Sequence, residues 1–157
     1  MTPRKRQRGV AAVEFGILII PLTLMLFGLT EYGRAIYQYN TLLKATRDAA
    51  RYLSTVAPGS EKEVAECLVL YGKQTSDCPD NSPDSPNPDV LAPYLTKDMV
   101  SISNLSVDIE GSVVNLVTVT ITNYEFQSLI NFPLGDLSVG TPNIKFGDIS
   151  NTMRQAL

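Results

Sequence analysis

The chain opens with a basic head that is followed by a long apolar run. The head holds four basic and no acidic residues, namely Arg4, Lys5, Arg6 and Arg8. The 21 residues from Val10 to Thr30 are long enough to cross the hydrocarbon layer of a membrane as one helix. Because a basic flank stays on the cytoplasmic side, the pattern predicts a single-pass protein with a cytoplasmic N-terminus and the rest of the chain across the membrane.

A single carboxylate, Glu14, interrupts this apolar run. A charged side chain well inside a membrane helix costs about 2.5 to 3.5 kcal/mol even on lenient insertion scales. Residues of this kind face a partner or a functional site rather than lipid. We therefore expect Glu14 to have a task that involves a partner group.

Two ordinary explanations compete for this segment. A cleaved secretory signal has an apolar stretch of about 7 to 15 residues and ends in an A-x-A-like site. The run here is longer, contains Glu14 and ends in Gly28-Leu29-Thr30-Glu31, so it fits that class poorly. An uncleaved membrane anchor fits the length and the basic flank, but it gives Glu14 no task.

The next segment alternates apolar and polar residues with a helical period. Apolar or uncharged residues recur at spacings of four and three, namely Ile36, Tyr39, Leu43, Thr46, Ala50 and Leu53. Charged residues fall elsewhere on the helix surface, and Pro58-Gly59 should end the helix. The pattern predicts an amphipathic helix over 31–56 that continues the membrane helix.

A second, short helix is predicted from Ser60 to Tyr71, where Ser60 and Glu63 have the spacing of a capping box. It leads into residues 74–93, which are rich in proline and aspartate and read as a loop. The aspartates lack the ligand order and the turn glycine of an EF-hand. We therefore expect a solvated loop rather than a metal site.

Cys67 and Cys78 are the only cysteines. The basic head places them across the membrane, where an oxidising compartment favours a disulfide. Closing a loop of this size would stabilise the fold by about 3 kcal/mol in the chain-entropy model. Two free thiols are the alternative, although the spacing is not the C-x-x-C of reactive dithiols.

Beyond Lys97 the pattern changes to the alternation of β-strands. Three apolar sets alternate with polar residues: Val100 and Ile102; Leu105, Val107 and Ile109; and Val117, Val119 and Ile121. Glu110-Gly111-Ser112 has the composition of a hairpin turn, residues 126–140 read as irregular, and residues 144–149 as an edge strand. The expected fold class is α+β, with a small antiparallel sheet packed on the amphipathic half of the long N-terminal helix.

Composition argues against catalysis and nucleic-acid binding. The chain has no histidine, which removes Ser-His-Asp and Cys-His centres and histidine-containing zinc sites. It also lacks the glycine motifs that bind nucleotides. The formal charge is −3, and loss of the basic head would lower it to −7, so no basic surface for phosphates is expected. We predict a protein that is not an enzyme, binds no nucleic acid and needs no cofactor.

The residues around Gly9 carry a resemblance to a known family. Arg8-Gly9-Val10-Ala11-Ala12-Val13-Glu14-Phe15 resembles the processing site of type IV pilins and pseudopilins. Together with Arg47-Asp48-Ala49-Ala50-Arg51-Tyr52, and with Ser150 and Thr152-Met153-Arg154, it is similar to TadE-like pseudopilins of tight-adherence pili. The resemblance implies a pilin-like fold and a protein of the bacterial inner membrane with a periplasmic head.

The resemblance also assigns roles within the motif. A membrane-embedded prepilin peptidase would cut between Gly9 and Val10, which makes Glu14 the fifth residue of the mature chain. Glycine before the cut lets the backbone lie extended against the protease. The new ammonium at Val10 and the Glu14 residue are separated by about 6 Å of helical rise, and by family precedent this glutamate meets the N-terminus of a neighbouring subunit. The implied partners are the peptidase, other pilins and the inner-membrane assembly platform.

The expected organisation is a leader at 1–9, a membrane helix at 10–30 and a periplasmic head at 31–157. Two functions are compatible with it. The first is a minor pseudopilin of a tight-adherence pilus, minor because major pilins of this subgroup are much shorter than 157 residues. The alternative is an uncleaved, membrane-anchored module whose head binds a ligand or partner. A mature chain that starts at Val10 would favour the first, and one that retains Arg4 to Arg8 the second.

Overall fold

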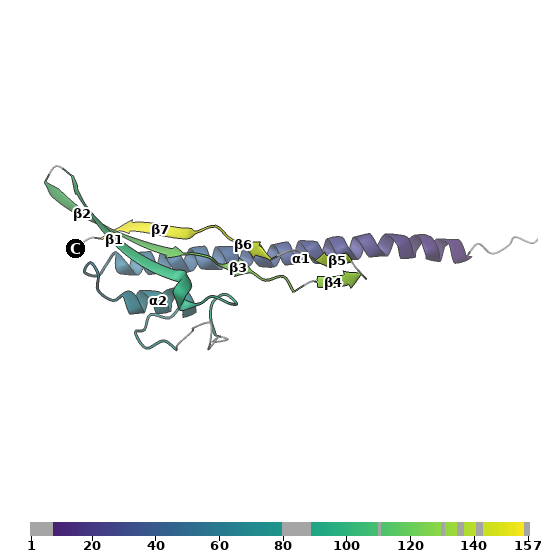
Figure 1. Cartoon of the computed structure of the whole chain (residues 1–157), viewed down its shortest axis with the longest axis horizontal. Helices are drawn as coiled ribbons and strands as arrows, with labels where there is room; N and C mark the ends of the chain where they lie inside the picture. The colour runs from purple at the N-terminus through teal and green to yellow at the C-terminus, as the bar shows by residue number, and fades with distance from the viewer. Residues whose placement is uncertain are drawn as a thin grey trace, which may run out of the picture. The chain divides into compact units, whose positions relative to one another are not determined.

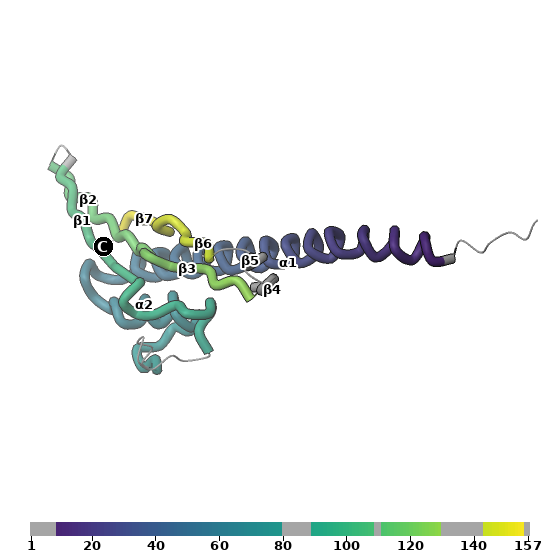
Figure 2. The backbone as a smooth tube through the Cα atoms, turned by 45° about the vertical axis from the view of Figure 1, so that its right-hand side comes forward, coloured from purple at the N-terminus to yellow at the C-terminus, as the bar shows by residue number. Residues whose placement is uncertain are grey.

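The computed structural model describes residues 8–79, 89–109, 111–129, 131–134, 137–140 and 143–155. The predicted basic residues Arg4, Lys5 and Arg6, the middle of the Pro/Asp loop and Glu110 of the predicted turn lie outside the described residues. Two compact units divide the chain: Met1–Ala35 with Ser128–Pro142, and Ile36–Gln127 with Asn143–Leu157. Figures 1 and 2 show the elements along the chain.

Helix α1 spans Arg8–Leu53 and continues through Pro21, so the predicted membrane and amphipathic segments belong to one helix. The helix ends at Leu53, and the predicted end at Val56 is wrong. The hydroxyls of Ser54 and Thr55 donate to the carbonyls three residues before them, at 2.7 Å each. The backbone tightens at the same place, where Thr55 N donates to Tyr52 O three residues back at 3.0 Å, and this tighter last turn ends the helix before Pro58 is reached.

The buried face of α1 is rotated from the predicted one. Thr46, Ala50 and Leu53 are buried as expected, but Ile36 is 43% exposed and Tyr39 is 41% exposed. Their places in the core are taken mainly by Gln38 and Leu42, which are 7% and 0% exposed. A polar residue can lie here because the Gln38 Oε1 atom is 3.0 Å from the Tyr124 hydroxyl. The spacing of apolar residues alone cannot predict that a glutamine is buried.

Helix α2 spans Lys62–Tyr71, and the predicted capping box is absent from it. The Ser60 hydroxyl donates to Ala57 O at 2.6 Å instead of capping the helix. Glu61 precedes the helix in the left-handed conformation with φ 52°, and its carboxylate accepts a hydrogen bond from the Tyr52 hydroxyl. The start of α2 is therefore fixed by a contact with the end of α1 rather than by a local cap.

The predicted disulfide between Cys67 and Cys78 is present, with 5.7 Å between the Cα atoms. Cys67 lies on α2 and is fully buried. The Tyr71 hydroxyl donates to Pro79 O at 3.1 Å, and Leu91 N donates to Leu70 O at 2.8 Å. Three contacts on α2 thus hold both ends of the Pro/Asp loop.

The main sheet is antiparallel, with the strand order β1-β2-β7. Its strands are β1 (Val100–Ile109), β2 (Ser112–Ile121) and β7 (Ile149–Arg154), and a short 3-10 turn, η1 (Lys97–Met99), precedes β1. Ile109 pairs with Ser112, so the hairpin predicted at this place is confirmed. Gly111 has φ 83°, a conformation that glycine adopts without strain.

The apolar side chains of the β1–β2 hairpin lie on one face of the sheet in one half of the hairpin and on the opposite face in the other half. Val117, Val119 and Ile121 are buried in the core, and Ile102 pairs with Val119 on the same face. The register is unbroken from Val100 to Ile109, so Leu105, which pairs with Leu116, lies on the opposite face. Leu105 is accordingly 61% exposed, and the two apolar sets before the turn belong to one strand but lie on opposite faces of it.

Short strand pairs complete the chain. β3 (Glu125–Phe126) pairs with β6 (Ile144–Lys145), and β4 (Asn131–Leu134) pairs with β5 (Leu137–Gly140). The expectation that 126–140 is irregular is therefore wrong, because backbone pairing between neighbouring segments gives a hairpin that the uneven side-chain pattern did not predict. The edge strand predicted over residues 144–149 is divided: its first two residues form β6, and its last residue begins β7, which pairs with β2 at the edge of the main sheet.

One hydrophobic core joins the C-terminal half of α1, α2 and the sheet. Its central members are Leu42, Ala49, Val69, Leu70, Val117 and Val119, all fully or almost fully buried. Figure 1 shows α2 and the β1–β2–β7 sheet beside this half of α1. The predicted α+β fold, a long N-terminal helix packed on a small antiparallel sheet, is confirmed.

Strand β7 is bound to α1 by side chains as well as by packing. The Asn151 Nδ2 group donates to Thr46 Oγ1 at 2.7 Å. The Gln155 Nε2 group donates to Leu53 O at 2.9 Å, and Gln155 N donates to Asn115 O on β2 at 2.8 Å. Gln155 therefore satisfies a carbonyl at the end of α1 that has no partner inside the helix.

Candidate functional site

The N-terminal part of α1 exposes apolar side chains around its whole circumference. Its most apolar stretch has a mean hydropathy of 2.3, and none of that stretch is buried by the described chain. The exposed fractions of Phe15, Ile17 and Leu18 are 65%, 66% and 67%. A helix that is apolar on all sides needs an apolar surrounding. Among the described residues, α1 is the helix that is long and apolar enough to cross a membrane.

Two hydroxyls in this stretch are satisfied within the helix itself. Thr23 Oγ1 donates to Ile19 O at 2.7 Å, and Thr30 Oγ1 donates to Phe27 O at 2.8 Å. These bonds remove the need for water or a partner protein at either side chain. Glu14 is then the one side chain between Val10 and Thr30 that retains a strong requirement for a polar partner.

Glu14 is exposed on α1 and has no hydrogen-bond or ion-pair partner in the described part of the chain. Gly9 and Val10 are the second and third residues of α1. Val10 and Glu14 are four residues apart on one helix, which places them on the same side. Because the first N–H groups of a helix have no intrahelical partner, the segment around Gly9 is the part of α1 that can unwind at least cost.

A second polar cluster follows the apolar stretch directly and was not predicted. Glu31 is 6% exposed, and its Oε2 atom accepts hydrogen bonds from the Arg34 guanidinium at 3.0 Å and from Leu129 N at 3.4 Å. The Ser128 side chain also bonds to this carboxylate. The cluster fixes the beginning of the 128–142 segment to α1.

Burial by itself would raise the pKa of Glu31. The hydrogen bond and charge of Arg34, together with the bonds from Ser128 and Leu129, have the larger effect in the opposite direction, so the pKa lies below the ordinary glutamate value. A carboxylate with a lowered pKa stabilises the folded state above its unfolded pKa. That stabilisation is lost as the pH falls through the folded pKa.

We expect Glu31→Gln to release Leu129 at neutral pH. The neutral amide keeps the size of glutamate but loses the charge that holds Arg34 and Leu129 N. The measurement is amide hydrogen exchange at Leu129 in detergent micelles, where faster exchange in the variant at pH 7 is expected and Glu63→Gln, an exposed glutamate on α2, should change nothing. In the native chain, protection should persist at pH 5 and fall only below the ordinary glutamate pKa. Equal exchange in native chain and variant would show that the cluster does not hold the segment.

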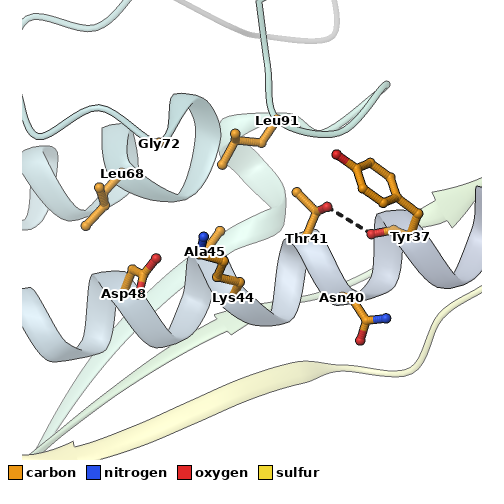
Figure 3. Close-up of a pocket in the computed structure, with 9 residues that line it drawn as sticks. All are labelled: Tyr37, Asn40, Thr41, Lys44, Ala45, Asp48, Leu68, Gly72 and Leu91. Carbon is orange, nitrogen blue, oxygen red and sulfur yellow. Dashed lines mark hydrogen bonds between the residues drawn. The ribbon is translucent and has the colours of Figure 1, made fainter.

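A groove of about 500 Å³ lies between α1 and α2 (Figure 3). Ala45 and Leu68 lie between the two helices, Leu91 closes one end, and Lys44 and Asp48 stand on α1 at the rim. The Thr41 hydroxyl is already bonded to Tyr37 O at 2.9 Å. The groove combines apolar walls with charges of both signs, which suits a protein or peptide contact better than a reaction centre.

The predicted pairing of Cys67 with Cys78 is confirmed. Gly9, Val10 and Glu14 lie on the first turns of α1, and their roles in processing and assembly stay predictions. Glu31, Gln38 and Gln155 were missed because each acquires its role from a residue far along the chain. A carboxylate that directly follows an apolar run was the one available signal for Glu31.

A family model described as TadE-like protein matches residues 9–51. The match covers Gly9, Glu14 and the run from Arg47 to Arg51, and it ends before α2 and the sheet. The resemblance predicted from the sequence is confirmed over this part of the chain. Neither the curated proteins nor the solved structures contain a match.

Proposed function

We propose that this chain is a minor pseudopilin of a tight-adherence pilus. In this role it is inserted in the bacterial inner membrane, cut by prepilin peptidase after Gly9, and assembled with other pilins through the apolar part of α1. The TadE-like match over residues 9–51 supports association with pilus components. The role is structural, and no step of it requires catalysis or a cofactor.

Glu14 is the observation that carries this proposal. It is the single charged side chain on a 21-residue apolar stretch whose other polar groups bond within the helix. Cleavage after Gly9 would create an ammonium four residues away, and the same group on a neighbouring copy offers a second partner. Pairing in a dry environment fixes the register between helices even where it adds little stability.

The mass of the mature N-terminus tests the proposal. We expect the protein isolated from native membranes to begin at Val10, as shown by intact mass and N-terminal sequencing. A protein that retains Arg4 to Arg8 in its working form would contradict it. The orientation, with the head in the periplasm, can be tested in the same preparation by protease access to intact cells with permeabilised outer membranes.

The groove between α1 and α2 favours a second candidate function. Its apolar walls and its two rim charges, Lys44 and Asp48, would suit a membrane-anchored module that binds a partner through its head. Such a module needs no processing, so an uncut N-terminus together with partner binding would identify it.

A further inference from the structure

Strand β1 is a long strand at the edge of the main sheet. It pairs with β2 without interruption over all ten of its residues, and the order β1-β2-β7 leaves its other side without a neighbouring strand. Figures 1 and 2 show the β1–β2 hairpin extending past the C-terminal end of α1. Unpaired backbone groups along such an edge can pair with another chain.

The bonding of β2 shows which backbone groups of β1 face outward. Gln155 N donates to Asn115 O at 2.8 Å, so Asn115 faces β7, and Ser106, which is opposite Asn115, faces away from β2. Because the direction alternates along a strand, Asn104 and Asp108 face outward as well. The described part of the chain makes no hydrogen bond to these outward backbone groups. We refer to the backbone groups of Asn104, Ser106 and Asp108 as the open edge.

The open edge lacks the features that keep sheet edges unpaired. Natural edge strands are blunted by prolines, charges, bulges or short length. Over its described length β1 contains neither a bulge nor a second charged residue besides Asp108, and its one-letter sequence has no proline. At the other edge, β7 is shorter, and the side chains of Asn151 and Gln155 bond it to α1. β1 is therefore the edge to which a further strand can add.

The side chains beside the open edge define the strand that fits it. Leu105 is 61% exposed on the outer face of the sheet, and the half-buried Val107 lies on the same face. Asn104 and Ser106 are exposed on the opposite face, where Asp108 has no ion pair within the described ranges. A complementary strand has apolar side chains on the Leu105 face, hydroxyl side chains on the other face, and a basic side chain opposite Asp108.

A second copy of this chain is poorly suited to supply the strand. Antiparallel pairing of two β1 strands requires a two-fold axis perpendicular to the sheet, which reverses every direction within the plane of the sheet. The C-terminal half of α1 packs along the sheet, so the two copies would have opposed α1 helices. Their apolar segments could not then enter one membrane from the same side. This choice of occupant rests on the proposed membrane insertion, whereas the open edge does not.

We propose that the open edge binds an extended segment of a different protein, which adds to the main sheet beside β1. The segment alternates apolar and hydroxyl side chains and carries a lysine or arginine opposite Asp108. Main-chain hydrogen bonds supply the affinity, and the alternating side chains supply the specificity. One edge takes one segment, so the contact does not repeat from copy to copy and suits a component that is present in few copies.

Amide hydrogen exchange of the full-length protein in detergent micelles tests the open edge directly. The probe is the peptide Val-Lys-Val-Thr-Val-Thr-Val, acetylated and amidated at its ends. We expect the peptide, in the millimolar range, to slow exchange at Ser106 and Asp108 at least about tenfold, because their N–H groups face outward. Exchange at Leu105 and Val107, whose N–H groups face β2, should not change. Unchanged exchange at both outward residues would overturn the proposal.

A peptide methylated on the backbone nitrogens of its lysine and both threonines is the matched control. It keeps every side chain but loses the donors that face β1, so it should protect neither Ser106 nor Asp108. Equal protection by the two peptides would show that side chains alone make the contact, which contradicts strand addition. Replacing the lysine of the unmethylated peptide by glutamate should weaken binding by about two- to fivefold, as expected for an exposed ion pair.

Ser106→Pro removes an outward N–H group and no bond to β2, and proline is tolerated at an open edge. Peptide binding, measured by fluorescence anisotropy, should weaken at least about tenfold. Ser106→Ala is the matched control, because it also loses the hydroxyl that donates to Asn115 Oδ1 at 2.7 Å but keeps the N–H group, and it should bind as tightly as the native chain. Equal binding by the two variants would overturn the proposal, and the exchange experiment decides it if the proline variant does not fold.

A photocrosslinker at position 105, beside the added strand, identifies the occupant in cells. We expect crosslinks to an extended segment of another protein, and a synthetic peptide of that segment should reproduce the protection of Ser106 and Asp108. Crosslinks that join only copies of this chain, or only lipid, would overturn the proposal. The N-terminal mass of the same sample separates the two hypotheses, because a chain that begins at Val10 but binds no strand contradicts strand addition alone.

Discussion

Glu14→Ala is expected to leave membrane insertion and cleavage after Gly9 intact while it abolishes assembly. The substitution removes a charge that costs about 2.5 to 3.5 kcal/mol to place in a membrane helix, so insertion should be unimpaired or better. Assembly should fail because each new N-terminal ammonium loses its carboxylate partner. Removing one member of a buried ion pair costs about 3 to 5 kcal/mol, which corresponds to a loss of roughly a hundredfold or more at each contact between subunits.

Sheared pilus fractions and membrane fractions, quantified by immunoblot, would measure this effect. Glu14→Gln should behave like the alanine variant, because it keeps the size of the side chain and loses the charge. Glu63→Ala removes an exposed glutamate from α2 and should assemble normally. Normal piliation in either Glu14 variant would remove the role assigned to this residue.

Gly9→Val is expected to block processing almost completely. A Cβ atom placed at Gly9 meets no other atom of the described chain within 4 Å, so the substitution does not disturb the protein's own packing. Its effect must then arise at the peptidase, where a branched side chain before the cut would clash with an enzyme that the bare backbone of glycine can approach closely. The precursor should accumulate with its basic head attached, as seen by intact mass.

Gly28→Val provides the matched control for this substitution. Gly28 also lies on α1 in open space and differs from Gly9 in being far from the cut. The Gly28 variant should be processed at the native rate. Efficient cleavage of the Gly9 variant would place the processing site elsewhere, and retention of the head by both variants would point to a general failure of insertion.

Features that depend on neighbouring residues were predictable from the sequence. The apolar run predicted a helix that is long and apolar enough to cross a membrane, because length and hydropathy are local properties. The alternation of Val117, Val119 and Ile121 predicted a strand with one buried face, and β2 has that face in the core. The disulfide partners were predictable because a chain with two cysteines has only one intramolecular pairing.

Features that depend on distant residues were not predictable. Gln38 is buried because Tyr124 lies beside its amide, and the two are 86 residues apart. Glu31 finds Leu129 across 98 residues. The hairpin of β4 and β5 is held by backbone pairing, which the pattern of side chains in this segment does not predict. Tertiary contacts therefore decided the polar members of the core and of the site.

The attachment of β7 to α1 has a consequence for folding. Asn151 and Gln155 bond to Thr46 and Leu53 across 105 and 102 residues of chain. Because β7 pairs with β2, the sheet lacks its third strand until residues 149–154 have been synthesised. Chains interrupted before that point would keep apolar surfaces of the core uncovered, which gives cellular quality control a means of recognising incomplete copies.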